Sequence, residues 1–364
     1  MTRNRPNQRG YILMSVGAAS IVLIGSVGLA VDLGRMYITK GEAQTFADSA
    51  ALAACLELDS TSDGIERARS AVANNPNRNA FGATAFTGTV VEFALASTGP
   101  WSTNPGSSTG YAFVRVNATV SVPLYFVALA VNRSQTDVVA SAVAGQVPKT
   151  SFSAGLFPFS PYAPLPNSPP DFGLNTGRLY TLRWPANPNI GNAQGNGSNM
   201  CPGDRNGAML TVASAAGGSE RGFIEDTSAN LIAQTIIDDY QTVFRNVGDL
   251  VNMTGGAKQS QLTSLSTRIN QDSDTTSGSY SSYRGNGRRI IAAPINDGGT
   301  PLGSNNRIVG IGAFFLSPTG QYGSGGGQAW CAEYIGCWLQ GSPHRCAVGG
   351  GSAAAGAYVA RLII

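Results

Sequence analysis

Residues 11–58 divide into an uncharged apolar stretch and an amphipathic continuation. Residues 11–31 read YILMSVGAASIVLIGSVGLAV, which is 21 residues without a charged side chain. At about 1.5 Å per helical residue, such a stretch spans the roughly 30 Å hydrocarbon layer of a bilayer. The pattern therefore predicts a transmembrane helix over residues 11–31.

The charges that flank this stretch predict its orientation. Three arginines precede it within residues 1–10, a basic leader, and Asp32 follows it. Because positively charged flanks remain in the cytoplasm, the leader is expected inside and everything after Asp32 outside. A cleavable secretory signal is the alternative, since Gly28-Leu29-Ala30 offers small residues at the positions that a signal peptidase inspects. The apolar run exceeds the usual signal core of about 7–15 residues, which favours an anchor.

Helix is expected to continue over residues 32–58. This segment has no proline, and its apolar residues recur mostly at three- and four-residue steps with charged residues between them. The whole stem would be roughly 70 Å long, with kinks expected at Gly34 and Gly41. An apolar half joined to an amphipathic half is the layout of a pilin stem, whose outer half packs on its own head. A membrane anchor with a simple stalk has the same pattern.

Residues 59–147 show the pattern of a small α+β module. A short helix is predicted over residues 62–75, and residues 124–131 can form a helical turn or two. Alternation of apolar and polar positions predicts strands over residues 89–95, 111–122 and 136–147. These parts are expected to pack as a head on the stem.

The second half of the chain begins with a proline-rich boundary. Seven prolines fall within residues 148–170, too many for a helix or a central strand, so an extended linker arm is expected there. Residues 171–364 then form a larger glycine-rich α+β domain. Its predicted elements are a long helix over 225–253 with a cap at Asp226 or Thr227, a helix over 258–269, and strands at 211–215, 307–316 and 358–364.

Several motifs near the N-terminus resemble a known family. They are Arg9-Gly10, the run GLAVDLGR from Gly28 to Arg35, Tyr37, and the run QTFADSAALAA over residues 44–54. These residues resemble the N-terminal module of TadE/TadG-like Flp pilus-assembly proteins of the tight-adherence system. Residues 114–126 and 138–145 are similar to the strand, short helix and strand that close that module. The resemblance implies a pilin-like minor pilin or an envelope component of the pilus machine.

Two candidate sites lie on the stem, the first implied by the resemblance and the second by residue spacing. A prepilin peptidase would cut between Gly10 and Tyr11, where the chain would also enter the membrane. The fifth residue after this cut is Ser15, whereas pilins and the TadE-like branch carry glutamate, so cleavage stays open. Gly25 and Gly28 lie one turn apart and would permit self-association of such helices or contact with other pilus subunits.

Composition excludes several classes of function. Charged residues make up 12% of the chain, against roughly 25% in ordinary soluble domains, and 46 residues are glycine. When the three leader arginines are set aside, the 24 basic residues fall to 21, equal to the 21 acidic ones. Nucleic acid needs a basic surface, so it is not an expected partner. No cofactor and no small-molecule substrate is expected either.

The cysteines predict disulfides in the exported body. Four of them lie in the last domain, and an even number outside the cytoplasm favours two intramolecular bridges whose pairing stays open. They are Cys201, Cys331, Cys337 and Cys346. The alternatives are free thiols or a zinc site that combines three of them with His344. Cys55 on the stem is expected to be a small buried apolar residue.

The remaining motifs predict little chemistry. Asn270, Asp272 and Asp274 imitate the start of a calcium loop, but the glycine and glutamate that such a loop needs are missing, so a polar loop is expected. Gly310-Ile311-Gly312 lacks the third glycine of a dinucleotide fingerprint and indicates a strand. His344, the one histidine, has no G-x-S-x-G elbow, and the adjacent Asp238-Asp239 would point in different directions on a helix.

The sequence thus predicts an α+β, non-enzymatic, pilin-like protein of the bacterial inner membrane or of a surface filament, supporting filament formation and adhesion. A membrane-anchored module that binds carbohydrate or a host surface through Trp330 and Trp338 is the main alternative. An anchored hydrolase that uses His344 is the third hypothesis.

Overall fold

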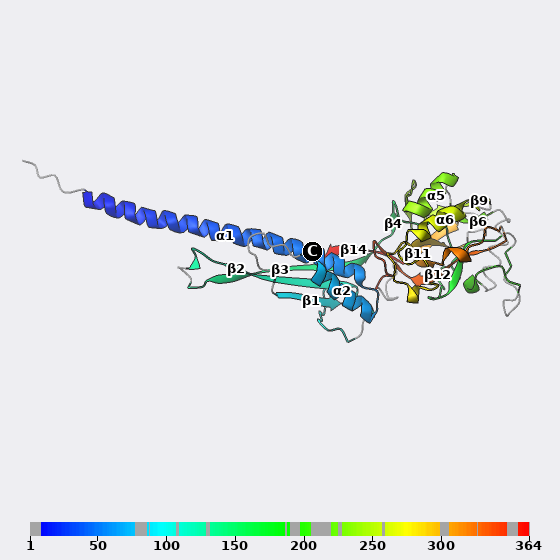
Figure 1. Cartoon of the computed structure of the whole chain (residues 1–364), viewed down its shortest axis with the longest axis horizontal. Coiled ribbons are helices and arrows are strands. Elements are labelled where there is room, and N and C mark those ends of the chain that lie inside the picture. The colour runs from blue at the N-terminus through cyan, green and yellow to red at the C-terminus, as the bar shows by residue number, and fades with distance from the viewer. Residues whose placement is uncertain are drawn as a thin grey trace, which may run out of the picture.

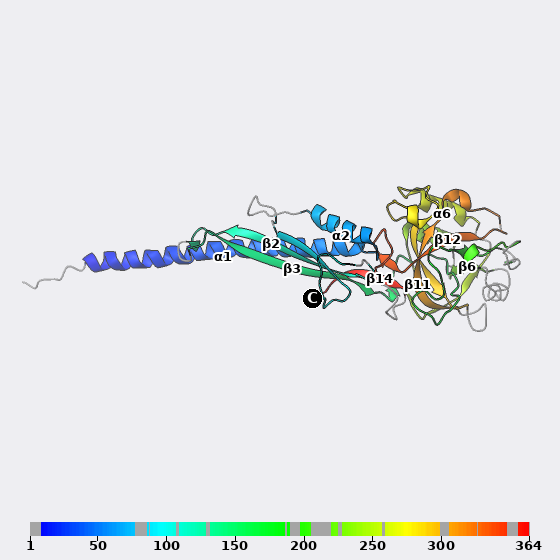
Figure 2. The same cartoon turned by 90° about the horizontal axis from the view of Figure 1, so that it is seen from below.

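The protein is a long helix that carries a small module along its outer half and a larger body beyond its end (Figures 1 and 2). The predicted α+β class with a long N-terminal helix is confirmed. The computed structural model describes residues 9–76, 86, 88–106, 109–128, 132–185, 188–189, 197–204, 220–224, 228–256, 259–298, 306–325, 327–347 and 356–363.

Helix α1 (Arg9–Glu57) contains 49 residues and joins the apolar and amphipathic halves of the stem. It continues without interruption through Gly34 and Gly41, the positions at which the sequence predicts kinks. The absence of proline and the density of alanine in the outer half explain this continuity.

The small module consists of one helix and a sheet that flank the outer half of α1. Helix α2 (Ser62–Asn74) begins after Thr61, whose hydroxyl accepts the Gly64 N–H at 3.0 Å. The strands β1 (Gly88–Ala94), β2 (Phe113–Pro123) and β3 (Gln135–Pro148) are antiparallel neighbours. Alternate residues of β2 are buried, as the sequence pattern predicts. The described part of the predicted turn after β2 is residues 124–128.

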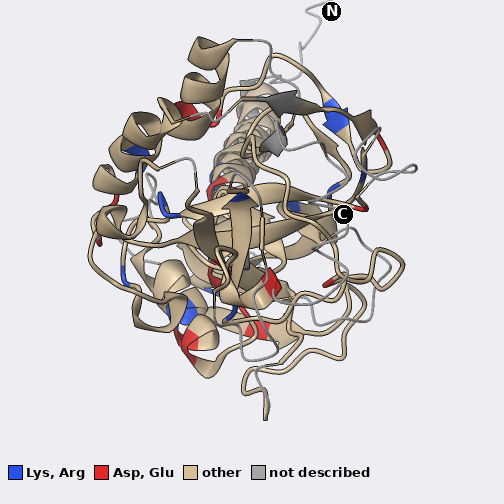
Figure 3. Ribbon diagram, turned by 90° about the vertical axis from the view of Figure 1, so that its right-hand side faces the viewer, with Lys and Arg blue, Asp and Glu red and all other residues tan. Residues whose placement is uncertain are grey.

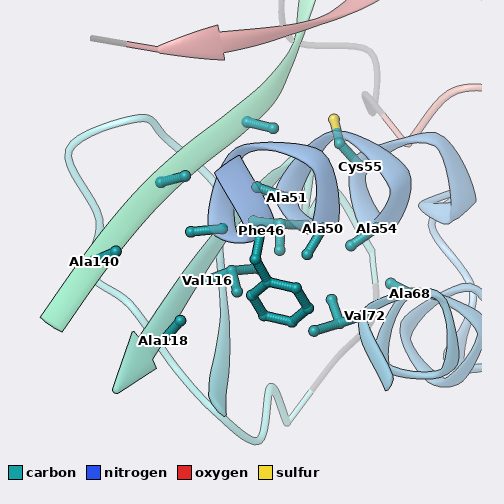
Figure 4. Close-up of a cluster of buried hydrophobic side chains, with 14 of the residues drawn as sticks. Phe46, Ala50, Ala51, Ala54, Cys55, Ala68, Val72, Val116, Ala118 and Ala140 are labelled. Atoms are coloured by element: carbon teal, nitrogen blue, oxygen red, sulfur yellow. The ribbon is translucent and has the colours of Figure 1, made fainter. Parts of the chain in front are cut away.

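The core of this module is built from small side chains. Ala47, Ala50 and Ala54 of α1 are fully buried in this core. Ala50 and Ala54 face the sheet and α2, and Phe46 fills the space between these elements (Figure 4). Alanine lets the backbones of the helix and the sheet approach closely. The outer half of α1 is therefore an integral part of the module.

The chain returns to this sheet at its other end. Strand β14 (Ala357–Ile363), within the segment predicted as a separate domain, pairs antiparallel with β3 and parallel with β13 (Trp338–Gln340). The order of the five-stranded sheet is β1-β2-β3-β14-β13. Its last two strands thus come from the second half of the chain and tie the body to the small module.

The body is built on a second sheet with the order β10-β11-β12-β5. These strands are β5 (Leu179–Arg183), β10 (Ile290–Asn296), β11 (Asn306–Leu316) and β12 (Trp330–Gly336). Helices α5 (Ala229–Asp238) and α6 (Gln261–Asn270) pack together, and their apolar residues share a core with β10, β11 and β12.

Short elements complete the body. Strand pairs β4 (Ser151–Phe152) with β7 (Arg245–Asn246) and β6 (Glu220–Ile224) with β9 (Met253–Gly255) lie outside the main sheet, and β8 (Leu250–Val251) pairs with β11. Three single helical turns, η1 to η3, cover Pro202–Asp204, Tyr280–Ser282 and Thr319–Gln321.

The predicted helix over residues 225–253 is wrong beyond residue 238. Helix α5 begins after Ser228, whose hydroxyl accepts the Leu231 N–H at 3.2 Å, and ends at Asp238. Asp239 adopts a left-handed conformation with φ 58°, which stops the helix. Its carboxylate binds Arg268 at 2.7 Å. The chain then turns into β7, β8 and β9, so the helical spacing of the later apolar residues is a coincidence. The predicted cap at Asp226 or Thr227 and the strand at 211–215 lie outside the described residues.

The proline-rich arm runs along the body and contributes to its core. Phe157 and Phe159 are buried, and the rings of Phe159 and Phe223 are 3.9 Å apart between centroids. Isolated bridges join Leu156 to Ala292 and Tyr162 to Asn296. The arm thus fixes the path by which the chain leaves the small module and enters the body.

Candidate functional site

The inner half of α1 is an exposed apolar surface. Every side chain from residue 11 to residue 27 is exposed, and α1 is long and apolar enough to cross a membrane. We call residues 11–27 the exposed stem. The serine hydroxyls of this segment form hydrogen bonds within the helix. Ser20 Oγ donates to the Val16 carbonyl at 2.8 Å, and Ser26 Oγ donates to the Leu23 carbonyl at 2.9 Å. The surface is therefore apolar all round.

A carboxylate lies immediately beyond this stretch. Asp32 is buried against the turn after β2, where its oxygens accept the N–H groups of Tyr125, Phe126 and Val127 at 3.1, 2.8 and 2.8 Å. The Val127 N–H is the largest influence that lowers the pKa of the Asp32 carboxyl, so this group stays ionised. Backbone donors thus stabilise a negative charge at the point where the apolar stretch ends.

Gly28 contacts the same turn, which corrects its predicted role. A Cβ at this position would lie 2.6 Å from Cβ and Cγ of Phe126, so glycine is needed for the turn to approach α1. The close approach at Gly28 is therefore within one chain, and a self-association role for this residue does not fit the structure. At Gly25 the space is open. The lone acid after an apolar run and the uncharged segment after β2 are the signals in the sequence that point to this contact.

A loop of the body docks on the outer end of α1. Ser342 Oγ donates to the Leu56 carbonyl at 2.7 Å, and Arg345 Nε donates to the Asp59 carbonyl at 3.2 Å. His344 Nε2 lies 3.2 Å from Glu57 Oε2. The His344 contact is the largest cause that lowers the pKa of the Glu57 carboxyl. His344 thus takes part in the junction between the stem and the body.

Two disulfides join the four cysteines of the body, as predicted. Cys201 pairs with Cys331 and Cys337 with Cys346, with Cα–Cα distances of 5.8 and 5.5 Å. The zinc alternative has no support within the described residues, where no three potential metal ligands form a group. Cys55 is a free and buried thiol, and burial raises its pKa to about 12.

The two tryptophans of the alternative hypothesis are buried. Trp330 is 1% exposed, and its ring lies under the Arg183 guanidinium at 4.7 Å. Trp338 is 8% exposed and lies 6.2 Å from Phe152 between ring centroids. A sugar or a host surface cannot stack on rings that fill a core, so the surface-binding role of these residues does not hold.

The other motifs are structural. Asp272 accepts the Tyr283 hydroxyl at 2.6 Å, and Asp274 accepts the Ser277 hydroxyl at the same distance, so the apparent calcium loop is a hydrogen-bonded turn. Gly312 lies within β11, where a Cβ would approach Phe314 and Tyr334 to 2.9 Å. This confirms a strand with close backbone approach.

Charge is mixed over the outer end of the body. In the view along the molecule, short basic and acidic segments are scattered among uncharged ones in the ribbon (Figure 3). This distribution agrees with the equal numbers of acidic and basic residues beyond the leader.

One comparison with known proteins gives a match. Residues 10–71 match the model of a family described as putative Flp pilus-assembly TadE/G-like. These residues are therefore similar to that family, and we call them the TadE/G-like module. The match covers nearly all of α1 and most of α2, which is the part of the chain that carries the motifs noted in the sequence. No curated protein and no solved structure matches the chain. The TadE/G-like module links the chain to pilus assembly, while the body lies beyond the matched residues.

Proposed function

We propose that this protein is a structural, membrane-anchored and pilin-like component of a Flp-type pilus system. The observation that carries the proposal is the exposed stem, an apolar helical surface without a charge that lies within the TadE/G-like module. Exposure of such a surface to water is unfavourable, so an apolar environment is expected to cover it. Lipid in the inner membrane, and the core of a filament after assembly, both provide that environment.

The proposed orientation places residues 1–10 in the cytoplasm and the body outside. The three leader arginines support this orientation through the positive-inside rule. Two disulfides in the body also support it, because such bonds persist in oxidising compartments. In a filament the body would then face outward, where adhesion takes place.

We further propose that the exposed stem meets other helices of the same kind. A Cβ at Gly25 would meet nothing within 4 Å, so a second helix can approach closely at this position. In this proposal, Gly10 and Tyr11 mark the point at which the chain enters the membrane. No catalytic step is part of the proposal, since the one histidine pairs with Glu57 at the junction.

A charge in the exposed stem tests this function. Leu23→Arg places a cation near the middle of the apolar stretch, at a cost of about 2.5–3.5 kcal/mol for membrane insertion. Leu95→Arg is the matched control, because Leu95 is equally exposed but lies on the small module. We expect Leu23→Arg alone to reduce the protein in the membrane fraction and in purified surface filaments, measured by quantitative mass spectrometry. Equal loss from both variants, or from neither, contradicts the proposal.

A further inference from the structure

A short apolar turn lies beside α1 at the end of the apolar stretch. Strand β2 ends at Pro123, and residues 124–128, which we call the tip, fold against the helix. The tip contains no charged residue, and its two aromatic side chains are exposed, Tyr125 by 56% and Phe126 by 46%. Two exposed aromatic side chains thus follow each other at the end of the module that lies beside the apolar stretch.

The tip is fixed at a defined depth along the stem. Phe126 covers Gly28, which lies inside the predicted membrane span, and the amides of the tip bind Asp32, the first residue beyond that span. At about 1.5 Å per residue, these two contacts are about 6 Å apart along α1. The tip therefore straddles the boundary between the apolar and the amphipathic halves of the helix.

We propose that the tip inserts into the headgroup region of the leaflet from which α1 emerges, and that it acts as a second membrane contact of the exported module. This inference rests on the proposed anchoring of the exposed stem. Lipid is the expected environment of the tip because the tip is continuous with the membrane span. Phe126 contacts the helical turn at Gly28, which lipid would surround, so the same lipid reaches the tip. Aromatic side chains are enriched at membrane interfaces, and Tyr11 and Tyr125 would then mark the two ends of the span.

The polar groups of the tip suit an environment that is poor in water. A backbone N–H without a partner is costly near hydrocarbon, and Asp32 accepts three such groups at once. The Arg35 guanidinium lies 4.4 Å from the centre of the Tyr125 ring, which leaves a cation at the level of the lipid phosphates. Arg133 is exposed next to Ser134, whose carbonyl accepts the Leu124 N–H at 2.9 Å. Long basic side chains of this kind reach phosphate groups.

Fluorescence quenching in proteoliposomes tests the proposal with the full chain. In a Cys55→Ala background, an environment-sensitive dye is attached at one cysteine introduced by Tyr125→Cys or, as a second tip position with a smaller change, by Ala128→Cys. Leu23→Cys reports on the exposed stem, and Leu95→Cys reports on a part of the module that is exposed and distant from the tip. Vesicles of phosphatidylethanolamine and phosphatidylglycerol carry a nitroxide at a shallow or a deep acyl position.

We expect the shallow nitroxide to quench either tip label several-fold more strongly than the Leu95 label, and the deep nitroxide to quench the Leu23 label most. Quenching at Leu23 with tip labels no different from the Leu95 label overturns the tip proposal and leaves the anchor intact. A blue-shifted tip label that no lipid nitroxide quenches also overturns it, because a second protein copy then covers the tip. Absence of quenching at Leu23 rejects the anchor itself.

Discussion

At the scale of single residues, the contact between Gly28 and Phe126 decides how the small module sits on the stem. Leucine at position 28 would occupy the space of the Phe126 ring, so the tip must move away from α1. We expect Gly28→Leu to destabilise the module by about 1–3 kcal/mol in detergent micelles. The measurement is hydrogen exchange of the Tyr125, Phe126 and Val127 amides. Their exchange should become several-fold faster because their hydrogen bonds to Asp32 are lost.

Gly25→Leu is the matched control for this prediction. The space around Gly25 is open, so the same change one turn earlier should leave those three amides protected. Equal exchange in Gly28→Leu and the unsubstituted protein would show that the tip does not depend on the glycine. A fall in protection with Gly25→Leu as well would point to a general effect on the helix.

Asp204 gives a prediction for pH. It is buried next to the Cys201–Cys331 bridge, and burial raises the pKa of its carboxyl from 3.8 to about 7, although the Thr181 N–H donates to it at 2.5 Å. The folded chain therefore keeps this proton up to about pH 7, whereas the unfolded chain loses it near the ordinary value. Stability from this group is thus fully present at low pH and decreases as pH rises between these two values, by at most about 1.4 kcal/mol per unit.

Asp204→Asn removes this titration and keeps an acceptor for the Thr181 N–H. We expect the free energy of unfolding of the variant, measured with denaturant at several pH values, to lose the downward slope between pH 4 and pH 7. Asp238→Asn is the control, because that side chain is exposed. An unchanged slope in Asp204→Asn would contradict the assignment.

At the scale of elements, the outer half of α1 is predicted to be a structural part of the module. Ala47 is fully buried, so Ala47→Asp places a charge between the helix and the sheet, with an expected cost of about 1–3 kcal/mol. Thr45→Asp adds the same charge two residues earlier on an exposed position. Thermal unfolding should separate the two variants, and equal melting temperatures would show that the outer half is only a stalk.

The elements differ in how far the sequence predicts them. Helix α1 and strands β1 to β3 follow from local patterns, because one face of each is buried and the other is exposed. The end of α5 does not, since it depends on Asp239, whose left-handed conformation accompanies a contact with Arg268, 29 positions later in the chain. The place of β14 beside β3 depends on an even longer separation, which no local pattern contains.

The candidate site also has parts that local sequence predicts and parts that depend on distant contacts. The apolar stretch that contains the exposed stem is evident from the absence of charge over residues 11–31, and the presence of two disulfides follows from the number of cysteines and the expected compartment. The burial of Trp330 and Trp338 was not predictable, because a tryptophan in a core and one on a binding surface have the same local sequence signal. The contact between Asp32 and the tip joins segments more than 90 residues apart.

At the scale of the whole molecule, the loop closed by Cys337 and Cys346 fastens the body to the stem. It is short, and closing a loop of about ten residues stabilises a fold by about 3 kcal/mol in the chain-entropy view. We expect the double variant Cys337→Ser with Cys346→Ser to expose the junction around Leu56 and Asp59 to hydrogen exchange. Cys201→Ser with Cys331→Ser should loosen the body instead and leave that junction protected. The reverse pattern would contradict this role of the loop.

The central claim is that one chain places its leader inside the cell and its body outside, with the exposed stem between them. Labelling of intact cells with a membrane-impermeant thiol reagent tests this directly. Two separate variants, both in a Cys55→Ala background, each carry one introduced cysteine. Asn7→Cys places it in the leader, and Leu165→Cys places it on the exposed surface of the body. The account predicts that, once the outer envelope is opened, position 165 is labelled at once, and that position 7 is labelled only after the inner membrane is made permeable. Labelling of position 7 in sealed cells, or protection of position 165 until the inner membrane is opened, would contradict it.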